Sequence, residues 1–252
     1  MSSHLLPSRF LVIYAKIPRA LIIFLYCALF SSVQRATGDD TATNTSEGIN
    51  NSRLFGYVEL ANNILEDGYS QTNHSFGVIS EVGFLKEQFR AGIRGNNVFF
   101  PNEASHLTLQ PYLGIIAHFD EQTKIFVEYE HRMYYSESRR NAGKVTVGFD
   151  MNDYSFRHQS LDNWWGLHIP KSRFAAHYRA RWNFSNLYSE FVVGYNAVGE
   201  VNTPNFFDFA VNVNKKSGNI RYFFEVVGLS QVVPYIANSS PLSYRVGAAV
   251  RF

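Results

Sequence analysis

Apolar and polar residues alternate with a period of two along most of the chain, in segments of roughly ten residues separated by turn residues. Three segments show the pattern well: Lys124–Tyr135, Ala176–Phe184 and Leu242–Phe252. In the last, Tyr244, Val246, Ala248, Val250 and Phe252 alternate with Arg245, Gly247, Ala249 and Arg251. Since successive side chains of a strand point to opposite faces, this pattern predicts strands with one apolar and one polar face.

Counting such segments predicts about twelve strands, with ten as the alternative. The predicted strands are Phe55–Asn63, His74–Phe84, Gln88–Val98, His106–Phe119, Lys124–Tyr135, Gly143–Asp150, Tyr154–His168, Arg173–Phe184, Tyr188–Val198, Asn205–Asn214, Asn219–Leu229 and Leu242–Phe252. The alternation is weakest in Tyr154–His168, where Trp164, Trp165 and Gly166 interrupt it.

A soluble β-sandwich also alternates, but two features favour a membrane barrel. The polar faces repeatedly carry two or three charges per strand, and the apolar faces end in Tyr, Phe or Trp. A wet interior and aromatic girdles have this signature. Closure would also remove the sheet edges, which lipid cannot hydrogen-bond. We therefore predict an all-β fold, an antiparallel transmembrane β-barrel over residues 54–252.

The first 36 residues differ from the rest. They hold four basic residues and no acidic one, the apolar run Ala20–Phe30, and then small residues, as in a secretory signal peptide. The alternative is a membrane anchor, although a run of this length is too short to span about 30 Å of hydrocarbon as a helix. Residues 37–53 are polar and predict a disordered lead-in.

The leader changes the charge balance. The chain has 23 Lys and Arg against 21 Asp and Glu, and removing the four basic residues of the leader leaves 19 against 21. The basic character is thus a targeting signal, and no nucleic-acid partner is expected. The one Cys, Cys27, lies within the apolar run behind Tyr26, which argues against a lipoprotein.

Two stretches resemble known families. The final Tyr-Arg-Val-Gly-Ala-Ala-Val-Arg-Phe resembles the last strand of bacterial outer-membrane proteins, which the barrel-assembly machinery recognises; this implies that machinery as a partner through the strand ending at Phe252. Gly56–Leu60, Asp67–Thr72 and Ala91–Val98 together resemble the opening strand, Arg-Gly-x-Ser-Gln-Ser turn and Gly-x-x-x-Ser-Asn-Val strand of the TorF-type porin family.

The chain departs from the TorF-type pattern at three positions, with Asp67 in place of Arg, Tyr69 in place of a small aliphatic residue and Asn96 in place of Ser. The resemblance fades beyond about Tyr135. It implies a channel-forming or structural barrel in the outer membrane, surrounded by outer-membrane lipid.

The polar faces predict the residues that line the lumen. They are Arg90, Arg94, Glu128, Glu130, Arg132, His177, Arg179, Arg181, Arg221, Glu225, Arg245 and Arg251. The excess of guanidinium groups predicts a mild preference for anions. The alternative is that these charges pair across strands and plug a narrow barrel.

One motif suggests catalysis. His158 and Ser160 are two residues apart on one predicted strand, the spacing found in outer-membrane acyl hydrolases, where His activates the Ser hydroxyl. Asp162, Asn163 or Ser172 would have to orient the His. The His residues show no metal-ligand spacing, so no metal or other cofactor is expected.

The sequence therefore favours a porin-like barrel in the bacterial outer membrane, without enzymatic activity, that lets small polar solutes diffuse passively. The alternatives are a lipid-modifying acyl hydrolase using His158 and Ser160, and a non-conducting structural barrel.

Overall fold

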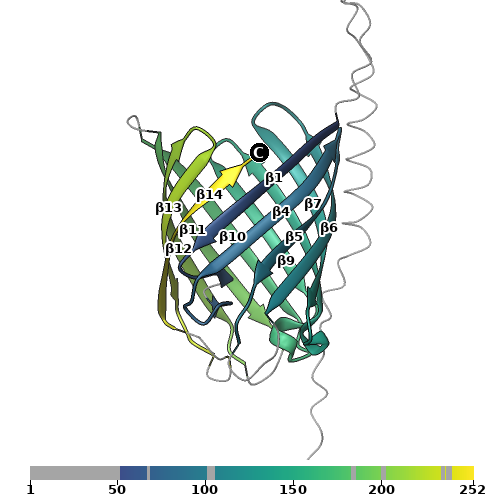
Figure 1. Ribbon diagram of the computed structural model, residues 1–252, viewed down its shortest axis with the longest axis vertical. Coiled ribbons are helices and arrows are strands. Elements are labelled where there is room, and N and C mark those ends of the chain that lie inside the picture. Colours follow the sequence, from purple (N-terminus) through teal and green to yellow (C-terminus); the bar gives the residue numbers. More distant parts are fainter. Residues whose placement is uncertain are drawn as a thin grey trace, which may run out of the picture. The chain divides into compact units, whose positions relative to one another are not determined.

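The computed structural model describes residues 52–66, 69–100, 106–182, 186–199, 203–233, 236 and 240–252, all within the compact unit Ile49–Phe252. Twelve strands close into one barrel (Figure 1). They are β1 (Ser52–Ala61), β4 (Gly77–Lys86), β5 (Phe89–Asn97), β6 (Leu107–His118), β7 (Thr123–Tyr134), β8 (Ala142–Met151), β9 (Tyr154–Leu161), β10 (Lys171–Arg181), β11 (Leu187–Val198), β12 (Phe206–Ser217), β13 (Ile220–Leu229) and β14 (Leu242–Arg251).

Each strand pairs antiparallel with its neighbours in the barrel, and β14 closes the barrel against β1 with the register Tyr57↔Arg251 to Ala61↔Gly247. Gly56 and Phe252 exchange backbone hydrogen bonds of 3.0 and 3.1 Å at this closing seam. The prediction of an all-β antiparallel barrel is confirmed, with twelve strands and not ten.

Several strand bounds differ from the predicted ones, and two of these differences matter for the fold. Strand β1 begins at Ser52, so Ser52 and Arg53 belong to the barrel and not to the lead-in. Strand β9 ends at Leu161 and not at His168, because the chain turns there through the 3-10 turn η2 (Trp164–Gly166). The two Trp residues that interrupt the alternation are thus the residues that end the strand. The predicted signal peptide and most of the predicted lead-in lie outside the described residues.

The two ends of the barrel are built differently. At the end where β1 begins and β14 finishes, which we call the turn end, neighbouring strands are joined by short turns (Figure 1). In the turn between β6 and β7, the Asp120 carboxylate accepts the backbone N–H groups of Gln122 and Thr123, both at 2.7 Å, and these bonds lower its pKa. At the opposite end, the loop end, the connections are longer.

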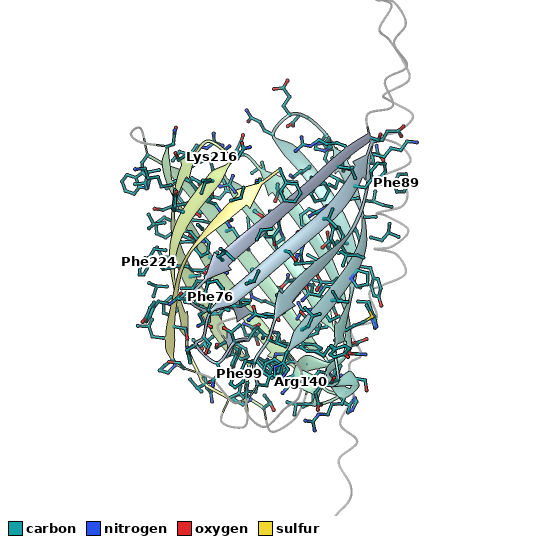
Figure 2. The ribbon with its side chains drawn as sticks, in the orientation of Figure 1. Phe76, Phe89, Phe99, Arg140, Lys216 and Phe224 are labelled. Carbon is teal, nitrogen blue, oxygen red and sulfur yellow. The ribbon has the colours of Figure 1, made fainter. Side chains whose placement is uncertain are left out.

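The outer face of the barrel is apolar, because the outward positions hold residues such as Val82, Leu113 and Val246, each at least half exposed. Aromatic side chains are spread over this face, with Phe89 toward the turn end, Phe224 at mid-height and Phe99 toward the loop end (Figure 2). Toward the turn end lie Phe89, Phe119, Tyr154, Tyr178 and Trp182, and toward the loop end lie Phe76, Phe99, Tyr135, Phe207 and Tyr244. The aromatic residues toward the two ends of this apolar belt match the girdles of membrane barrels.

The buried apolar core lies at the loop end and not along the lumen. Its most deeply buried members include Tyr69, Trp164, Phe206, Val233 and Ile236, all at most 4% exposed. Tyr69 belongs to a small hairpin that the alternation did not predict, made of β2 (Leu65–Glu66) and β3 (Tyr69–Ser70) in the connection from β1 to β4. Among the described residues, no helix is long and apolar enough to cross a membrane.

Candidate functional site: the charged lumen

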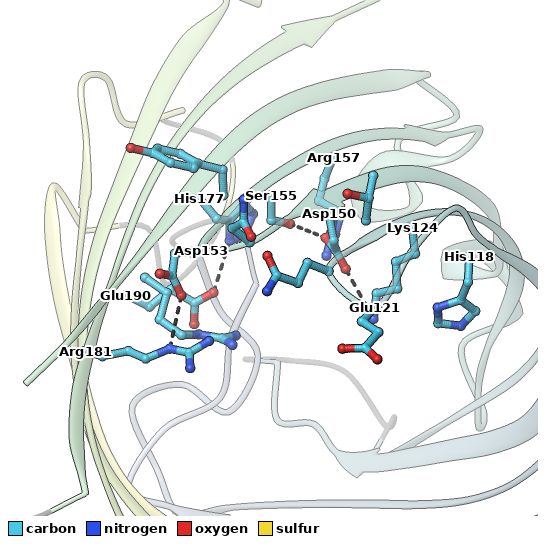
Figure 3. A pocket seen from close by; sticks show the side chains of 15 residues that line it. His118, Glu121, Lys124, Asp150, Asp153, Ser155, Arg157, His177, Arg181 and Glu190 are labelled. Carbon is cyan, nitrogen blue, oxygen red and sulfur yellow. Dashed lines mark hydrogen bonds and ion pairs between the residues drawn. The ribbon is translucent and has the colours of Figure 1, made fainter.

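Inward-facing side chains of the strands enclose two cavities. The first, of about 630 Å³, opens near the turn end and is lined by the ends of β6 to β11 (Figure 3). The second, of about 410 Å³, lies deeper, and its lining includes Ile64, Leu65, Glu66 and Gln71 of the β2–β3 connection. His177 borders both cavities.

The wall formed by β4 to β8 carries a connected set of ion pairs. Glu81, which is 4% exposed, binds Arg90 at 2.7 Å and Arg94 at 3.3 Å. Glu130 is fully buried and binds Arg94 at 2.9 Å, Arg132 at 2.9 Å and Lys144 at 2.7 Å. Arg94 therefore joins the two carboxylates into one network across this wall.

Local sequence explains how Glu81 is positioned. Tyr112 on β6 donates its hydroxyl to Glu81 at 2.6 Å, and the guanidinium carbon of Arg90 lies 4.9 Å from the Tyr112 ring centroid. The ring reaches so far because Gly83 and Gly92 pair with each other beneath it, where any added Cβ would collide with the Tyr112 hydroxyl. Without side chains at these two positions, the ring can lie across β4 and β5.

The rest of the barrel wall repeats this chemistry twice. Glu59 on β1 binds Arg221 and Arg245 at 2.9 Å each, and Arg245 also contacts Glu225. On β10 to β12, Arg173 and Asp208 form a two-pronged pair at 2.9 and 2.6 Å, and Asn196 donates to the same carboxylate at 2.6 Å. Parallel N–H···O bonds of this kind fix geometry as well as charge.

The turn-end cavity mixes both signs of charge. Asp150 accepts from Ser155 and pairs with Arg157 and Lys124, while His177 lies 3.5 Å from Glu190 (Figure 3). Arg181 pairs with Asp153 at 3.1 Å at the rim, where its side chain is 72% exposed. Arg179 lines the same cavity, with its guanidinium carbon 5.6 Å from the centroid of the Tyr188 ring. The cavity thus presents opposite charges across a solvent-accessible space.

The structure places all twelve residues of the predicted lumen set on inward-facing positions of their strands. Seven of them line the two cavities, whereas Arg90, Glu128, Glu130, Arg221 and Arg251 do not. Arg251 lies opposite Tyr57 at the exposed rim. Whether these side chains line a conducting path is a separate question of function.

Sequence reasoning found Glu128, Glu130 and Glu225 but missed other carboxylates that pair with arginines of the lumen. Glu59, Glu81 and Asp208 alternate with apolar residues in their own strands and could have been found by the same rule. Glu66, which contacts Arg132, lies in the β2–β3 hairpin and has no strand pattern to reveal it.

The His158 and Ser160 pair faces outward. Both alternate with the cavity-lining Arg157 and Gln159, and the His158 ring packs on the exposed Phe174 at 4.2 Å between centroids. Within the described part of the chain, His158 Nδ1 has no hydrogen-bond partner, and no hydrogen bond links His158 to Ser160.

The groups proposed to orient His158 are engaged elsewhere or misplaced. Asp162 accepts from the Gly143 N–H at 2.8 Å, Asn163 donates to two loop carbonyls, and Ser172 lies opposite Ser160 and not His158. This geometry gives a hydrolase no assembled triad. Among the described residues, no three His, Cys, Asp or Glu side chains group as a metal site.

A closed antiparallel barrel of twelve strands, apolar outside and charged inside, defines the fold class of transmembrane β-barrels. Solved structures of that class are similar to it. The KdgM porin matches with a TM-score of 0.52 and 13% identity over 79% of this chain and 99% of the porin. The NanC porin matches with a TM-score of 0.50 and 11% identity over 79% and 99%.

A second KdgM structure, described as a complex with disordered oligogalacturonate, matches with a TM-score of 0.51 and 11% identity over 80% of this chain and 99% of that one. Identities this low show a shared fold. No protein-family profile and no curated sequence matches the chain, so the TorF-type resemblance stays a prediction.

Proposed function

We propose that this protein is a porin-like barrel of the bacterial outer membrane that lets small polar solutes diffuse passively through its lumen. The observation that carries the proposal is the closed twelve-strand barrel with an apolar belt outside and polar cavities of about 630 and 410 Å³ inside. Eight strands enclose an interior filled by side chains and 16 to 18 leave an open channel. Twelve strands fit a narrow path for small solutes.

The lumen supports only a weak preference for anions. Most of its arginines have carboxylate partners, so the guanidinium groups do not form an uncompensated positive ring. Arg179 and Arg181 lie on the wider turn-end cavity, where a solute would meet them first from that side. One KdgM structure is described as a complex with oligogalacturonate, which is a saccharide anion. This supports the proposal that a barrel of this fold accepts an anionic solute.

The last strand supports two further parts of the proposal. Phe252, which directly follows β14 and is 73% exposed, would be available to the barrel-assembly machinery before closure. After closure, the apolar belt would contact outer-membrane lipid. We propose no catalytic role, since the His158 and Ser160 pair lacks an orienting partner.

Two measurements test the channel. Proteoliposomes should swell in sugars, amino acids and organic anions at rates that fall with solute size, and heat-denatured protein should give no swelling. In a KCl gradient across a planar bilayer, the reversal potential should indicate a weak anion preference. Arg179→Gln should shift the permeability ratio about two- to threefold toward cations, as expected for one charge several Å from the path in a water-like dielectric.

The matched control is Arg251→Gln, which removes an arginine that lines neither cavity and should change the ratio less. A cation preference of the unmodified protein would contradict the proposed preference for anions. Absence of swelling by every solute would favour a non-conducting structural barrel.

A further inference from the structure

The connection between β1 and β4 is longer than two neighbouring strands need, and it is folded. Asn63, 1% exposed, accepts hydrogen bonds from the Ser70 hydroxyl at 2.6 Å and the Thr72 hydroxyl at 3.1 Å. Backbone bonds from Gln71 to Ile64 at 2.8 Å and from Ile64 to the Thr72 hydroxyl at 3.2 Å complete the set. The β2–β3 hairpin is thus a preformed unit and not a loose loop.

This hairpin crosses the mouth of the barrel at the loop end. It leaves the wall at β1 and β4, yet Tyr69 on β3 is completely buried against Trp164, Trp165 and Phe206, with ring centroids 5.8 to 6.0 Å apart. In the closed strand order, the β9–β10 loop that carries both Trp residues lies on the side of the barrel opposite β1 and β4. The contact therefore bridges the opening.

Two polar contacts hold the hairpin on the side of the mouth formed by β5 to β7. The Glu66 carboxylate forms an ion pair with Arg132 on β7, and the Phe99 N–H donates to the Gln71 carbonyl at 2.8 Å. Below these residues lies the deeper cavity, so the hairpin forms its cover at the loop end.

Trp165 is held in a strained backbone conformation at this contact. Its φ of 56° is uncommon for any residue with a side chain and a clear outlier for a bulky one. Phe100, with its ring centroid 5.4 Å from that of Trp165, and Arg140, which lies over the ring and donates to the Trp165 carbonyl at 3.2 Å, also contact it. Strain of this kind persists only where the surroundings enforce it and is concentrated at ligand clamps and switch regions.

We propose that the β2–β3 hairpin is a gate that closes the loop-end mouth and sets which solutes pass, with Tyr69 as its latch. This proposal rests on the channel function proposed above. The closed state is the one in which Tyr69 packs on Trp164, Trp165 and Phe206 and Glu66 pairs with Arg132. Opening withdraws the ring from this cluster and joins the deeper cavity to the outside.

Planar-bilayer recordings of Tyr69→Ala test the gate. Removing one aromatic ring from three edge-to-face contacts should raise the open probability roughly tenfold. Tyr69→Phe keeps the ring and should behave as the unmodified protein. Tyr178→Ala, which removes a tyrosine ring from the exposed outer face, should also leave conductance unchanged. Folded barrels change their electrophoretic mobility on heating, and this shift verifies that each variant has folded into a complete barrel.

A second variant guards against misfolding of Tyr69→Ala. Replacing residues 64–71 by a short Gly-Ser linker removes the cover, and β1 and β4 can still be joined because they are neighbours. Its conductance should exceed that of the unmodified protein, and it should admit larger solutes in the swelling assay.

The outcomes separate the gate from the channel. If the unmodified protein and both opened variants conduct equally, the gate is wrong and the channel stands. If only the opened variants conduct, the gate is supported and unassisted diffusion is not. If no variant conducts, both proposals fail. Opening by Tyr69→Phe as strong as by Tyr69→Ala would also refute the latch, because the ring contacts are then irrelevant.

Discussion

At the scale of single residues, the lumen is held together by carboxylates that each serve several cations. Glu130 is the clearest case, because one fully buried carboxylate contacts Arg94, Arg132 and Lys144. Desolvated charges of this kind are costly unless every partner is present. The three cations can lie close together only because the Glu130 carboxylate offsets the repulsion between them.

The substitution Glu130→Gln should destabilise the barrel by about 3 kcal/mol, since it keeps the volume but leaves three cations without their shared anion. The free energy of unfolding, measured by urea titration of the protein in lipid vesicles, checks this value.

The control for this measurement is Asp153→Asn, which breaks the exposed pair with Arg181, whose side chains are 38% and 72% exposed. Exposed pairs contribute about 0 to 1 kcal/mol, so this loss should be small. Equal losses in the two variants would show that burial of Glu130 has no energetic consequence.

At the scale of elements, closure depends on close contact between the first and last strands. Gly247 on β14 lies opposite Ala61, and a Cβ at this position would collide with the Leu60 carbonyl oxygen of the β1 backbone. A backbone atom cannot move aside as a flexible side chain can. The seam is therefore sensitive to a single methyl group.

We expect Gly247→Ala to lower the folded fraction, with a cost of about 1 to 3 kcal/mol from overpacking. Gly95→Ala on β5 is the matched control, because the nearest atom to an added Cβ there is 3.5 Å away. The fraction of protein that shows the folded electrophoretic mobility after refolding is the readout. Similar folded fractions for the two alanine variants would contradict a tightly closed seam.

At the scale of the whole molecule, the two ends of the barrel differ in a way that predicts its orientation. Outer-membrane barrels have short turns on the periplasmic side and longer loops outside the cell. By this rule, the turn-end cavity opens toward the periplasm, and the aromatic cover around Tyr69 faces the exterior.

Cysteine labelling in intact bacteria tests this orientation. A membrane-impermeant maleimide should label Gln231→Cys, in the exposed connection after β13, and should not label Asn219→Cys, in the exposed turn between β12 and β13. Both variants should react in lysed cells, and the unmodified protein reports the background. Labelling of Asn219→Cys alone in intact cells would reverse the assignment of the two ends.

The sequence by itself determined the wall of the barrel. Because side chains alternate across a strand, the parity of a position decides whether it faces inward or outward. This rule was enough to predict twelve strands and to place Arg90, Glu130 and Arg245 on the inner side. It failed only where the chain leaves the period of two, as at Trp164 and Trp165.

Only the tertiary structure decided which charges meet and what closes the mouth. Glu59 and Arg245 are 186 residues apart in sequence, and only the closing of β14 onto β1 brings them to 2.9 Å. Tyr69 carries no strand signal beyond its own short hairpin, and its burial depends on a loop from the opposite wall. Alternation is a local property of the sequence, and it determines whether a side chain faces the lumen or the lipid. The ion-pair partners and the packing of the β2–β3 hairpin depend on closure of the barrel, because closure joins segments that are distant in sequence.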